Sequence, residues 1–169
     1  MMEEKKLSAP VRVIRAVYNI LATALIALGA AVALLWIAGI RPYAVVSGSM
    51  EPEISVGSIC VVNHNASYSK IKKGDIIAFR AGEDVLVTHR AVSVTEDGII
   101  TKGDANNAED AAPVKKKDFV GKTMFSIPLI GYIITFVHTR HGLIASAAIL
   151  AAFILIGAAI PDKKREKKK

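Results

Sequence analysis

The chain has 169 residues and a formal net charge of +7; 52% of its residues are hydrophobic but only 6% are aromatic. Most of the apolar residues gather in two uninterrupted blocks, a pattern typical of membrane helices and not of a soluble core with a regular hydrophobic period. The basic excess lies at the two ends, since residues 41–141 carry twelve Lys and Arg against eleven Asp and Glu. A nucleic-acid-binding protein would carry that excess on its folded domain, so we predict no nucleic-acid partner.

The first apolar block, residues 17–40, is 24 residues long and contains no charged residue. As a helix it would reach about 36 Å, longer than a hydrocarbon core of about 30 Å. We therefore predict a transmembrane helix at 17–40, preceded by a basic tail at 1–16. A cleavable signal peptide is the alternative, but this run is longer than an ordinary signal-peptide core.

The second apolar block covers residues 142–160 and ends before Pro161 and a lysine-rich tail at 161–169. An interfacial helix would need a polar face, and Ser146 is the only polar residue in this block, so we predict a second transmembrane helix. Basic segments stay on the cytoplasmic side. We therefore predict a multi-pass protein of the cell membrane with both termini cytoplasmic and residues 41–141 on the outer face.

Residues 41–141 show the pattern of a β domain. Short β-branched segments bounded by turn residues predict strands at 58–63, 76–80, 85–94 and 98–102, with turns at 72–75, 81–84 and 96–98. Residues 125–137 form a third apolar stretch that is too short to span a bilayer. We interpret it as either a buried strand or a segment lying against the membrane.

Ser49 is the candidate nucleophile. It lies in Ser-Gly-Ser-Met-Glu-Pro at 47–52, where small residues let the backbone bend and Pro52 stiffens the exit. The same composition is also common in ordinary loops. Ser49 follows the first apolar block by nine residues, at most about 30 Å of extended chain, so we expect it near the membrane surface.

A serine nucleophile needs a base, and His89 is the best-placed histidine because it stands within a predicted strand. A histidine in a strand is more often structural than catalytic. His64 has the sequence surroundings of a solvated loop, and His138 and His141 flank Arg140 at the predicted membrane interface.

A histidine base needs an orienting carboxylate, and the polar loop after residue 102 offers Asp104 and Asp110. An Asx-rich turn is the structural alternative for this loop. The single cysteine, Cys60, has apolar neighbours and reads as a buried structural thiol. No clustered ligand spacing or cofactor motif is present in the sequence, so we predict no metal and no cofactor.

Four sequence blocks, in this order behind a membrane anchor, resemble type I signal peptidases of the archaeal and endoplasmic-reticulum branch. They are SGSMEP at 47–52, KKGDIIAF at 72–79, VTHRAV at 87–92 and TKGDANNAED at 101–110. The bacterial and mitochondrial branch of that family has a lysine where this chain has His89. The histidine therefore indicates the Ser-His-Asp branch.

The resemblance implies a mainly β fold, an antiparallel β catalytic domain flanked by two transmembrane helices and shared distantly with self-cleaving repressors of the SOS response. It implies that Ser49 attacks the scissile carbonyl and that His89 acts as general base. Of the two aspartates, the resemblance favours Asp110 as the partner of His89 and leaves Asp104 to support the loop. The backbone N–H of Ser49 and the hydroxyl of Ser47 would form the oxyanion hole.

By the same resemblance, the substrates are exported pre-proteins whose signal peptides are cut after small residues at Ala-x-Ala sites. Shallow apolar subsites accept a methyl group and exclude larger side chains, and Met50 is the candidate lining residue. The expected partners are these pre-proteins, the lipid bilayer, and the protein-export channel or accessory subunits.

Two other functions remain open from the residues alone. The first is a protease of the same fold dedicated to one exported substrate, and the second is a catalytically silent membrane scaffold. A third function, a β-domain subunit that gates a transporter, is not favoured, because it would place charged residues inside the spans and 17–40 and 142–160 contain none.

Overall fold

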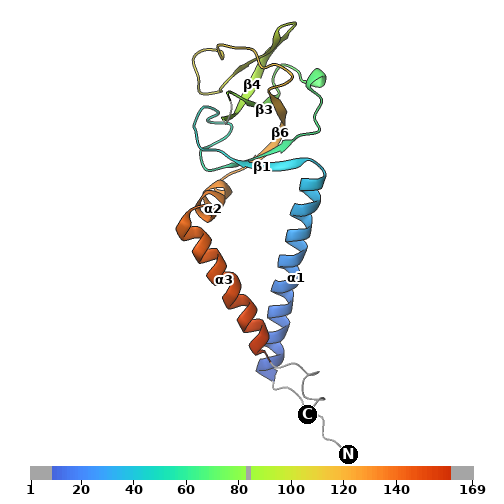
Figure 1. Cartoon of the computed structure of the whole chain (residues 1–169), viewed down its shortest axis with the longest axis vertical. Helices are drawn as coiled ribbons and strands as arrows, with labels where there is room; N and C mark the ends of the chain where they lie inside the picture. The colour runs from blue at the N-terminus through green and yellow to red at the C-terminus, as the bar shows by residue number, and fades with distance from the viewer. Residues whose placement is uncertain (1–8, 83–84, 161–169) are drawn as a thin grey trace, which may run out of the picture. The chain divides into compact units, whose positions relative to one another are not determined.

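A computed structural model describes residues 9–82 and 85–160, which belong to two compact units (Figure 1). One unit joins Met1–Leu34 with Thr139–Lys169, and the other comprises Leu35–His138. The predicted basic tail at 1–16 is described only from residue 9. The predicted lysine-rich tail at 161–169 lies outside the described residues, as does the second half of the turn predicted at 81–84.

The first unit contains helix α3 (Arg140–Ala159) and most of helix α1 (Ala9–Ile37). Both helices are strongly apolar, yet α1 buries none of its residues and α3 buries only Gly142. A core helix of a soluble protein would be mostly buried, so apolar exposure on this scale suggests association with a membrane. Tyr18 of α1 stacks on Phe153 of α3 with 4.7 Å between ring centroids.

Helix α1 begins and ends earlier than the span predicted at 17–40. Pro10 lies in the first turn, where its missing N–H costs no hydrogen bond, and Arg12 is a good helix former, so the helix extends beyond the uncharged block. At the other end, Gly39 takes a left-handed φ of +72° that breaks the helix. Ile40 therefore starts a strand and does not end the helix.

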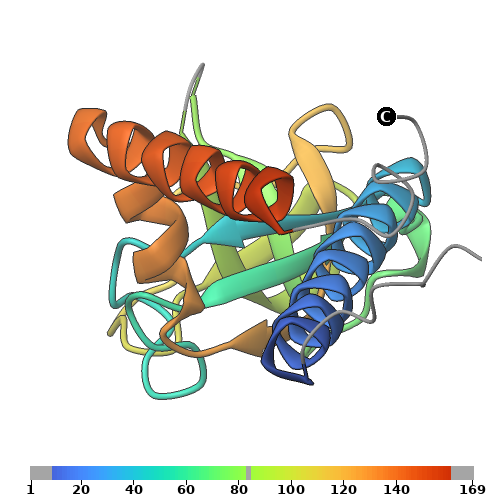
Figure 2. The same cartoon turned by 90° about the horizontal axis from the view of Figure 1, so that it is seen from below.

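The second unit is built on an antiparallel sheet that has six strands among the described residues, in the order β1-β2-β6-β3-β4-β5. The strands are β1 (Ile40–Ala44), β2 (Ile59–Asn63), β3 (Ile76–Arg80), β4 (Leu86–Thr95), β5 (Gly98–Lys102) and β6 (Phe119–Ile127). Strands β1 and β2 run side by side in both views (Figures 1 and 2). Strand β6 joins this pair to the β3-β4-β5 group by inserting between β2 and β3.

All four predicted strands are confirmed to within a residue at each end, as β2, β3, β4 and β5. The sequence did not indicate β1 or β6. Strand β1 contains Arg41 and Pro42, which break the apolar alternation, but its place at the sheet edge lets Pro42 lack a ladder hydrogen bond. Strand β6 carries Gly121 and Lys122 among its apolar residues.

The interpretation of 125–137 as a buried strand is wrong for most of its length. Only Phe125–Ile127 continue β6, and a short helix, α2 (Ile130–Val137), follows. Pro128 ends the ladder, and Leu129 turns the chain at a φ of 67°. Large apolar side chains of α2 remain exposed in this unit: Tyr132, Ile133 and Phe136.

The expected antiparallel β domain is thus present, whereas the description of the whole chain as mainly β is supported only in part. Helices α1 and α3 have 29 and 20 residues, whereas the longest strand, β4, has 10. The two apolar blocks form continuous helices, and these helices contain more residues than the six short strands of the sheet.

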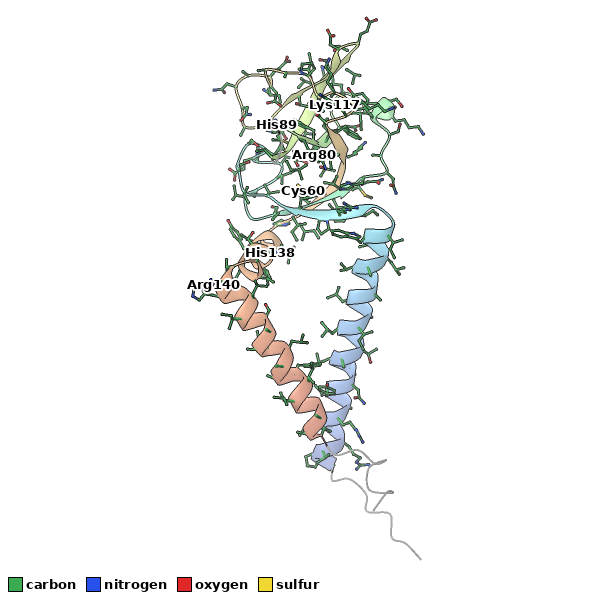
Figure 3. The ribbon with its side chains drawn as sticks, viewed as in Figure 1. Cys60, Arg80, His89, Lys117, His138 and Arg140 are labelled. Atoms are coloured by element: carbon green, nitrogen blue, oxygen red, sulfur yellow. The ribbon has the colours of Figure 1, made fainter. Side chains whose placement is uncertain are left out.

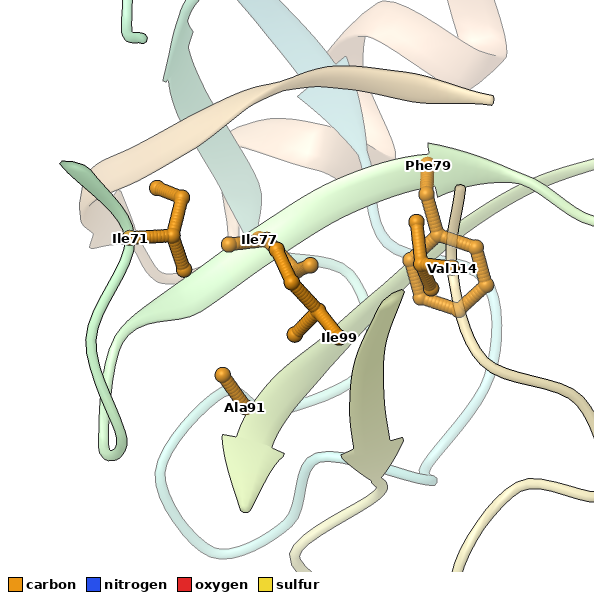
Figure 4. Close-up of a cluster of buried hydrophobic side chains, with 6 residues drawn as sticks. All are labelled: Ile71, Ile77, Phe79, Ala91, Ile99 and Val114. Atoms are coloured by element: carbon orange, nitrogen blue, oxygen red, sulfur yellow. The ribbon is translucent and has the colours of Figure 1, made fainter. Parts of the chain in front are cut away.

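The core of the sheet unit lies on both faces of the sheet, and strand β3 shows why. Ile77 and Phe79 pack into one buried cluster, whereas Ala78 packs into the other, because successive strand side chains point to opposite faces. The first cluster, drawn in Figure 4, contains Ile71, Ile77, Phe79, Ala91, Ile99 and Val114. The second contains Met50, Ile54, Cys60, Val62 and Ala78.

One ion pair ties the turn before β3 to strand β6. Lys122 Nζ lies 2.6 Å from Asp75 Oδ1, and the Lys72 N–H donates to Asp75 Oδ2 at 3.0 Å. Burial alone would raise the pKa of Asp75, but the hydrogen bonds and the charges of Lys122 and Lys72 outweigh it and lower the pKa.

We expect Asp75→Asn to lower the Tm of the full chain in detergent by a few °C at pH 7. The folded state lowers the pKa of Asp75, so this stabilisation is present above the pKa of the unfolded carboxyl, about 3.9. It is lost as the pH falls through the lower folded-state pKa, and the two Tm values should converge in acid. Circular dichroism melts across this range check the expectation, with the exposed Glu96→Gln as control. A difference that stays constant with pH would contradict it.

Candidate active site

Ser49 lies in a turn between β1 and β2 that two backbone hydrogen bonds close. The Glu51 N–H donates to Gly48 O at 3.0 Å, and the Ile54 N–H donates to Met50 O at 2.9 Å. Met50 is only 2% exposed and packs in the second core cluster. The core therefore anchors the residue next to Ser49, and Ser49 itself stays partly exposed.

His89 lies in the middle of the sheet unit on β4 (Figure 3). It pairs with Ile77 of β3, and the ring of Phe79 meets its imidazole edge-on at 6.1 Å between centroids. The residue is 7% exposed. A histidine held by a strand on one side and an aromatic ring on the other has little freedom to rotate.

The fold brings Ser49, His89 and Asp110 into one line of hydrogen bonds. His89 Nδ1 lies 2.7 Å from Asp110 Oδ2, and His89 Nε2 lies 3.1 Å from Ser49 Oγ. A carboxylate can only accept, so Nδ1 carries the proton of the neutral ring and Nε2 is free to accept from the serine hydroxyl. This arrangement can activate a serine nucleophile.

Thr101, which the sequence analysis did not single out, fixes the Asp110 carboxylate. Its Oγ1 donates to Asp110 Oδ2 at 2.6 Å, and its carbonyl accepts from the Asp110 N–H at 2.8 Å. Thr101 is fully buried on β5. A hydroxyl residue in the strand predicted at 98–102, just before the acidic loop, was the signal that could have found it.

Asp104 does not contact His89 but pairs with its neighbour on β4. Arg90 Nε and Nη2 donate to the two Asp104 oxygens at 2.8 Å and 2.6 Å, and Arg90 Nη1 donates to Gly74 O at 3.0 Å. The hydrogen bond to Asp104 raises the pKa of Arg90. Two parallel hydrogen bonds of this kind fix the orientation of the loop that carries Asp104. Arg90 was not among the candidates that the sequence indicated.

The loop that begins at Gly103 supports the backbone of Ser49 directly. The Ala105 N–H donates to Ser49 O at 2.9 Å. A Cβ atom at Gly103 would lie 2.6 Å from the same carbonyl oxygen, so only glycine fits there. The Arg90–Asp104 pair can thus act on the Ser49 backbone through Gly103 and Ala105, the two neighbours of Asp104 in the chain.

Two cavities adjoin the imidazole of His89. One, of about 470 Å³, has both Ser47 and Ser49 in its wall, and Met50 and Cys60 line it as well. The other, of about 440 Å³, is lined by Asp110 but not by Ser49. A molecule that reacts with Ser49 must enter the first, which we call the serine cavity.

The remaining candidate groups do not join this line of hydrogen bonds. Burial raises the pKa of Cys60 to about 11, which leaves it as an inert thiol although it borders the serine cavity. His64 lies in the turn after β2, as its sequence surroundings predict, but it is only partly exposed and forms a hydrogen bond of 2.8 Å with Tyr43 Oη. The described residues contain no cluster of three metal-ligating side chains.

Comparisons with known proteins match most of the second unit. Residues 17–117 match the family model for signal peptidase, peptidase S26. The chain is 40% identical over 89 residues to signal peptidase I W of Bacillus subtilis, covering 50% of this chain and 47% of that relative. It is 30% identical over 109 residues to the signal peptidase complex catalytic subunit SEC11 of Metarhizium acridum, covering 57% and 63%.

The human signal peptidase complex catalytic subunit SEC11C is 29% identical over 126 residues, covering 66% of this chain and 65% of that relative. The matched segments thus span about half to two thirds of the length of these relatives.

If Asp104 holds the loop on the serine turn, Asp104→Asn should loosen the Ala105 N–H. We expect its amide hydrogen to exchange about tenfold faster. A hydrogen bond to a charged group stabilises a fold by about 1.5–3 kcal/mol, so its loss makes local opening of the loop more frequent. Hydrogen exchange of the full chain in detergent measures this. Asp97→Asn, which changes an exposed aspartate in the turn between β4 and β5, is the matched control and should leave Ala105 unchanged. Unaltered protection in Asp104→Asn would show that the pair does not support Ser49.

Proposed function

Because the chain belongs to the signal peptidase family, peptidase S26, we propose that it is a membrane-bound serine endopeptidase that removes N-terminal signal peptides from exported pre-proteins. The observation that carries this proposal is the line of hydrogen bonds from Asp110 through His89 to Ser49, which ends at the serine cavity. The relatives' names, a signal peptidase and catalytic subunits of a signal peptidase complex, support the same activity.

In the proposed acylation step, Ser49 Oγ attacks the scissile carbonyl carbon while its proton passes to His89 Nε2. The tetrahedral intermediate collapses, the C–N bond breaks, and the leaving amine takes the proton from Nε2. The signal peptide is then an ester on Ser49. Water attacks the carbonyl carbon of this ester and gives a proton to His89 Nε2. The bond between that carbon and Ser49 Oγ then breaks, the signal peptide leaves with a free carboxyl group, and Nε2 returns the proton to Ser49 Oγ.

Asp110 stabilises the imidazolium that forms in both steps, since its carboxylate already accepts from Nδ1. The oxyanion that develops on the scissile carbonyl would be held by the Ser49 N–H and the Ser47 hydroxyl. Ser47 borders the serine cavity together with Ser49 and is exposed, which supports this role. One such donor is typically worth about 10²–10³ in rate.

We propose that the serine cavity selects small residues at Ala-x-Ala sites. Its wall is largely aliphatic, with Val45, Leu86 and Met50 beside the two serines. Met50 is anchored in the core, so it cannot swing away to admit a larger side chain. An apolar subsite that accepts a methyl group discriminates against larger groups mainly by shape.

We also propose the membrane arrangement that the charges favour. Helices α1 and α3 would cross the cell membrane, both termini would be cytoplasmic, and residues 41–141 would lie on the outer face. The basic residues of both tails support this orientation. Because two relatives are named as subunits of a complex, accessory subunits or the export channel are the proposed partners.

The first test is cleavage of a pre-protein with an Ala-x-Ala site by the purified full chain in detergent. We expect Ser49→Ala and His89→Ala to lower the cleavage rate by at least about 10³-fold, because the three groups act as a unit. Ser69→Ala and His138→Ala, which change the same residue types outside the serine cavity, are the matched controls. N-terminal sequencing of the product gives the position of the cut.

A folded wild type that cleaves no pre-protein would favour the silent scaffold. Cleavage of one exported protein alone, in a survey of pre-proteins, would favour the dedicated protease. Full activity of His89→Ala would refute the proposed base.

Thr101 offers a second test, because it touches Asp110 and no substrate. We expect Thr101→Val to lower kcat about tenfold with little change in KM, since the carboxylate loses the donor that orients it. Thr101→Ser retains a hydroxyl and should recover most of the rate. Equal losses in both variants would mean that Thr101 acts through packing and not through its hydrogen bond.

A further inference from the structure

A third cavity, of about 530 Å³, lies beyond the wall that Tyr43 and Leu86 share with the serine cavity. Three of its lining side chains are basic: Arg41 of β1, His64 after β2, and Arg80 at the end of β3, labelled in Figure 3. None of the described residues that line it is acidic. We call it the basic cavity.

Among the residues that the structure describes, neither arginine of the basic cavity has a carboxylate partner: no carboxylate lies within ion-pair distance of Arg41 or Arg80. Arg41 Nε is buried and, within the described structure, has no hydrogen-bond partner. A buried guanidinium donor without an acceptor is costly, and an entering anion would satisfy it.

The charge of both arginines reaches the same point in the cavity. Burial lowers the pKa of His64, and the charges of Arg41 and Arg80 lower it further. Two guanidinium groups that both act on one imidazole create a positive potential where an anion can bind. Tyr43 Oη holds the imidazole in place through its 2.8 Å hydrogen bond to Nε2.

The position of the basic cavity close to the end of α1 indicates which kind of anion would bind in it. Arg41 follows the end of α1 by four residues, at most about 14 Å of chain, and its guanidinium lies 4.8 Å from the centroid of the Trp36 ring. Within the second unit, the segment between Trp36 and Arg41 is hydrogen-bonded to the turn after β2: the His64 N–H donates to Gly39 O, and Asn65 Nδ2 donates to Ala38 O. If α1 lies in a membrane, Trp36 and Arg41 lie at the depth of the lipid headgroups.

We propose that Arg41, His64 and Arg80 form a binding site for the phosphate of an anionic phospholipid headgroup. Two planar guanidinium forks match the oxygens of a phosphate, and the imidazole adds a third donor. The basic cavity is large enough for a headgroup. The shared chemistry is that of a phosphate oxyanion, so the test separates a lipid headgroup from free phosphate.

Trp36 is the only tryptophan of the chain, so its fluorescence reports on Arg41 without a label. The full chain in an uncharged detergent at low salt is titrated in separate arms with phosphatidylglycerol, phosphatidylcholine and inorganic phosphate. We expect a saturable change with phosphatidylglycerol at concentrations at least tenfold below those needed for the other two. This readout does not depend on peptidase activity, so its failure and that of the proposed function are distinguishable.

Arg80→Gln removes one guanidinium from an exposed position and should weaken phosphatidylglycerol binding about tenfold or more. His64→Gln tests the site a second time and should weaken binding several-fold. Lys117→Gln, which removes an exposed cation outside the basic cavity, is the matched control and should bind as wild type does.

Equal affinities of wild type and Arg80→Gln would overturn the site. A wild type that binds inorganic phosphate as tightly as phosphatidylglycerol would overturn the lipid assignment in favour of a free oxyanion. Equal binding of phosphatidylcholine would show that anionic charge is not what the cavity recognises.

Discussion

The pairing of β4 with β5 is the constraint on which the candidate site depends. His89 and Arg90 are neighbours on β4 and point to opposite faces of the strand, so one aspartate cannot serve both. The loop after β5 supplies two: Asp110 meets His89, and Asp104 meets Arg90. Because this loop starts from the strand paired with β4, its reach and register are set by the sheet itself.

This arrangement separates reactivity from support. The Asp110–His89–Ser49 line holds the groups that can exchange protons, whereas the Arg90–Asp104 pair holds the loop whose Ala105 N–H supports the Ser49 backbone. An arginine remains charged at every physiological pH, so the supporting pair keeps its attraction across that range. The six-residue spacing between Asp104 and Asp110 therefore lets one loop reach both Arg90 and His89.

Strong local signals in the sequence were enough for much of this structure. Apolar blocks predicted two long helices, and β-branched runs between turn residues predicted four strands, because burial and turn chemistry act on consecutive residues. Strands β1 and β6 were not predicted because they carry the charged residues Arg41 and Lys122. Arg41 is accommodated on an edge strand, and Lys122 pairs with Asp75. Tertiary context decided those segments.

The site shows the same division. Residue type and order identified Ser49, His89, Asp104 and Asp110 as candidates. Thr101 and Arg90 were not identified, since each contributes through a partner that only the fold brings near. For His64, the loop composition predicted the turn but gave no sign of the Tyr43 hydroxyl or of the charges of Arg41 and Arg80. Long-range contacts of this kind have no local signature.

The burial of Cys60 has a practical consequence for studying this chain. Burial raises the pKa of Cys60 to about 11, so the thiol stays protonated at neutral pH, and the residue is only 1% exposed. Alkylating reagents will pass over the native thiol, so the wild-type chain already serves as a cysteine-free background. A single cysteine introduced on either tail or on an exposed loop can then report which side of a membrane it faces, with no compensating change in the core.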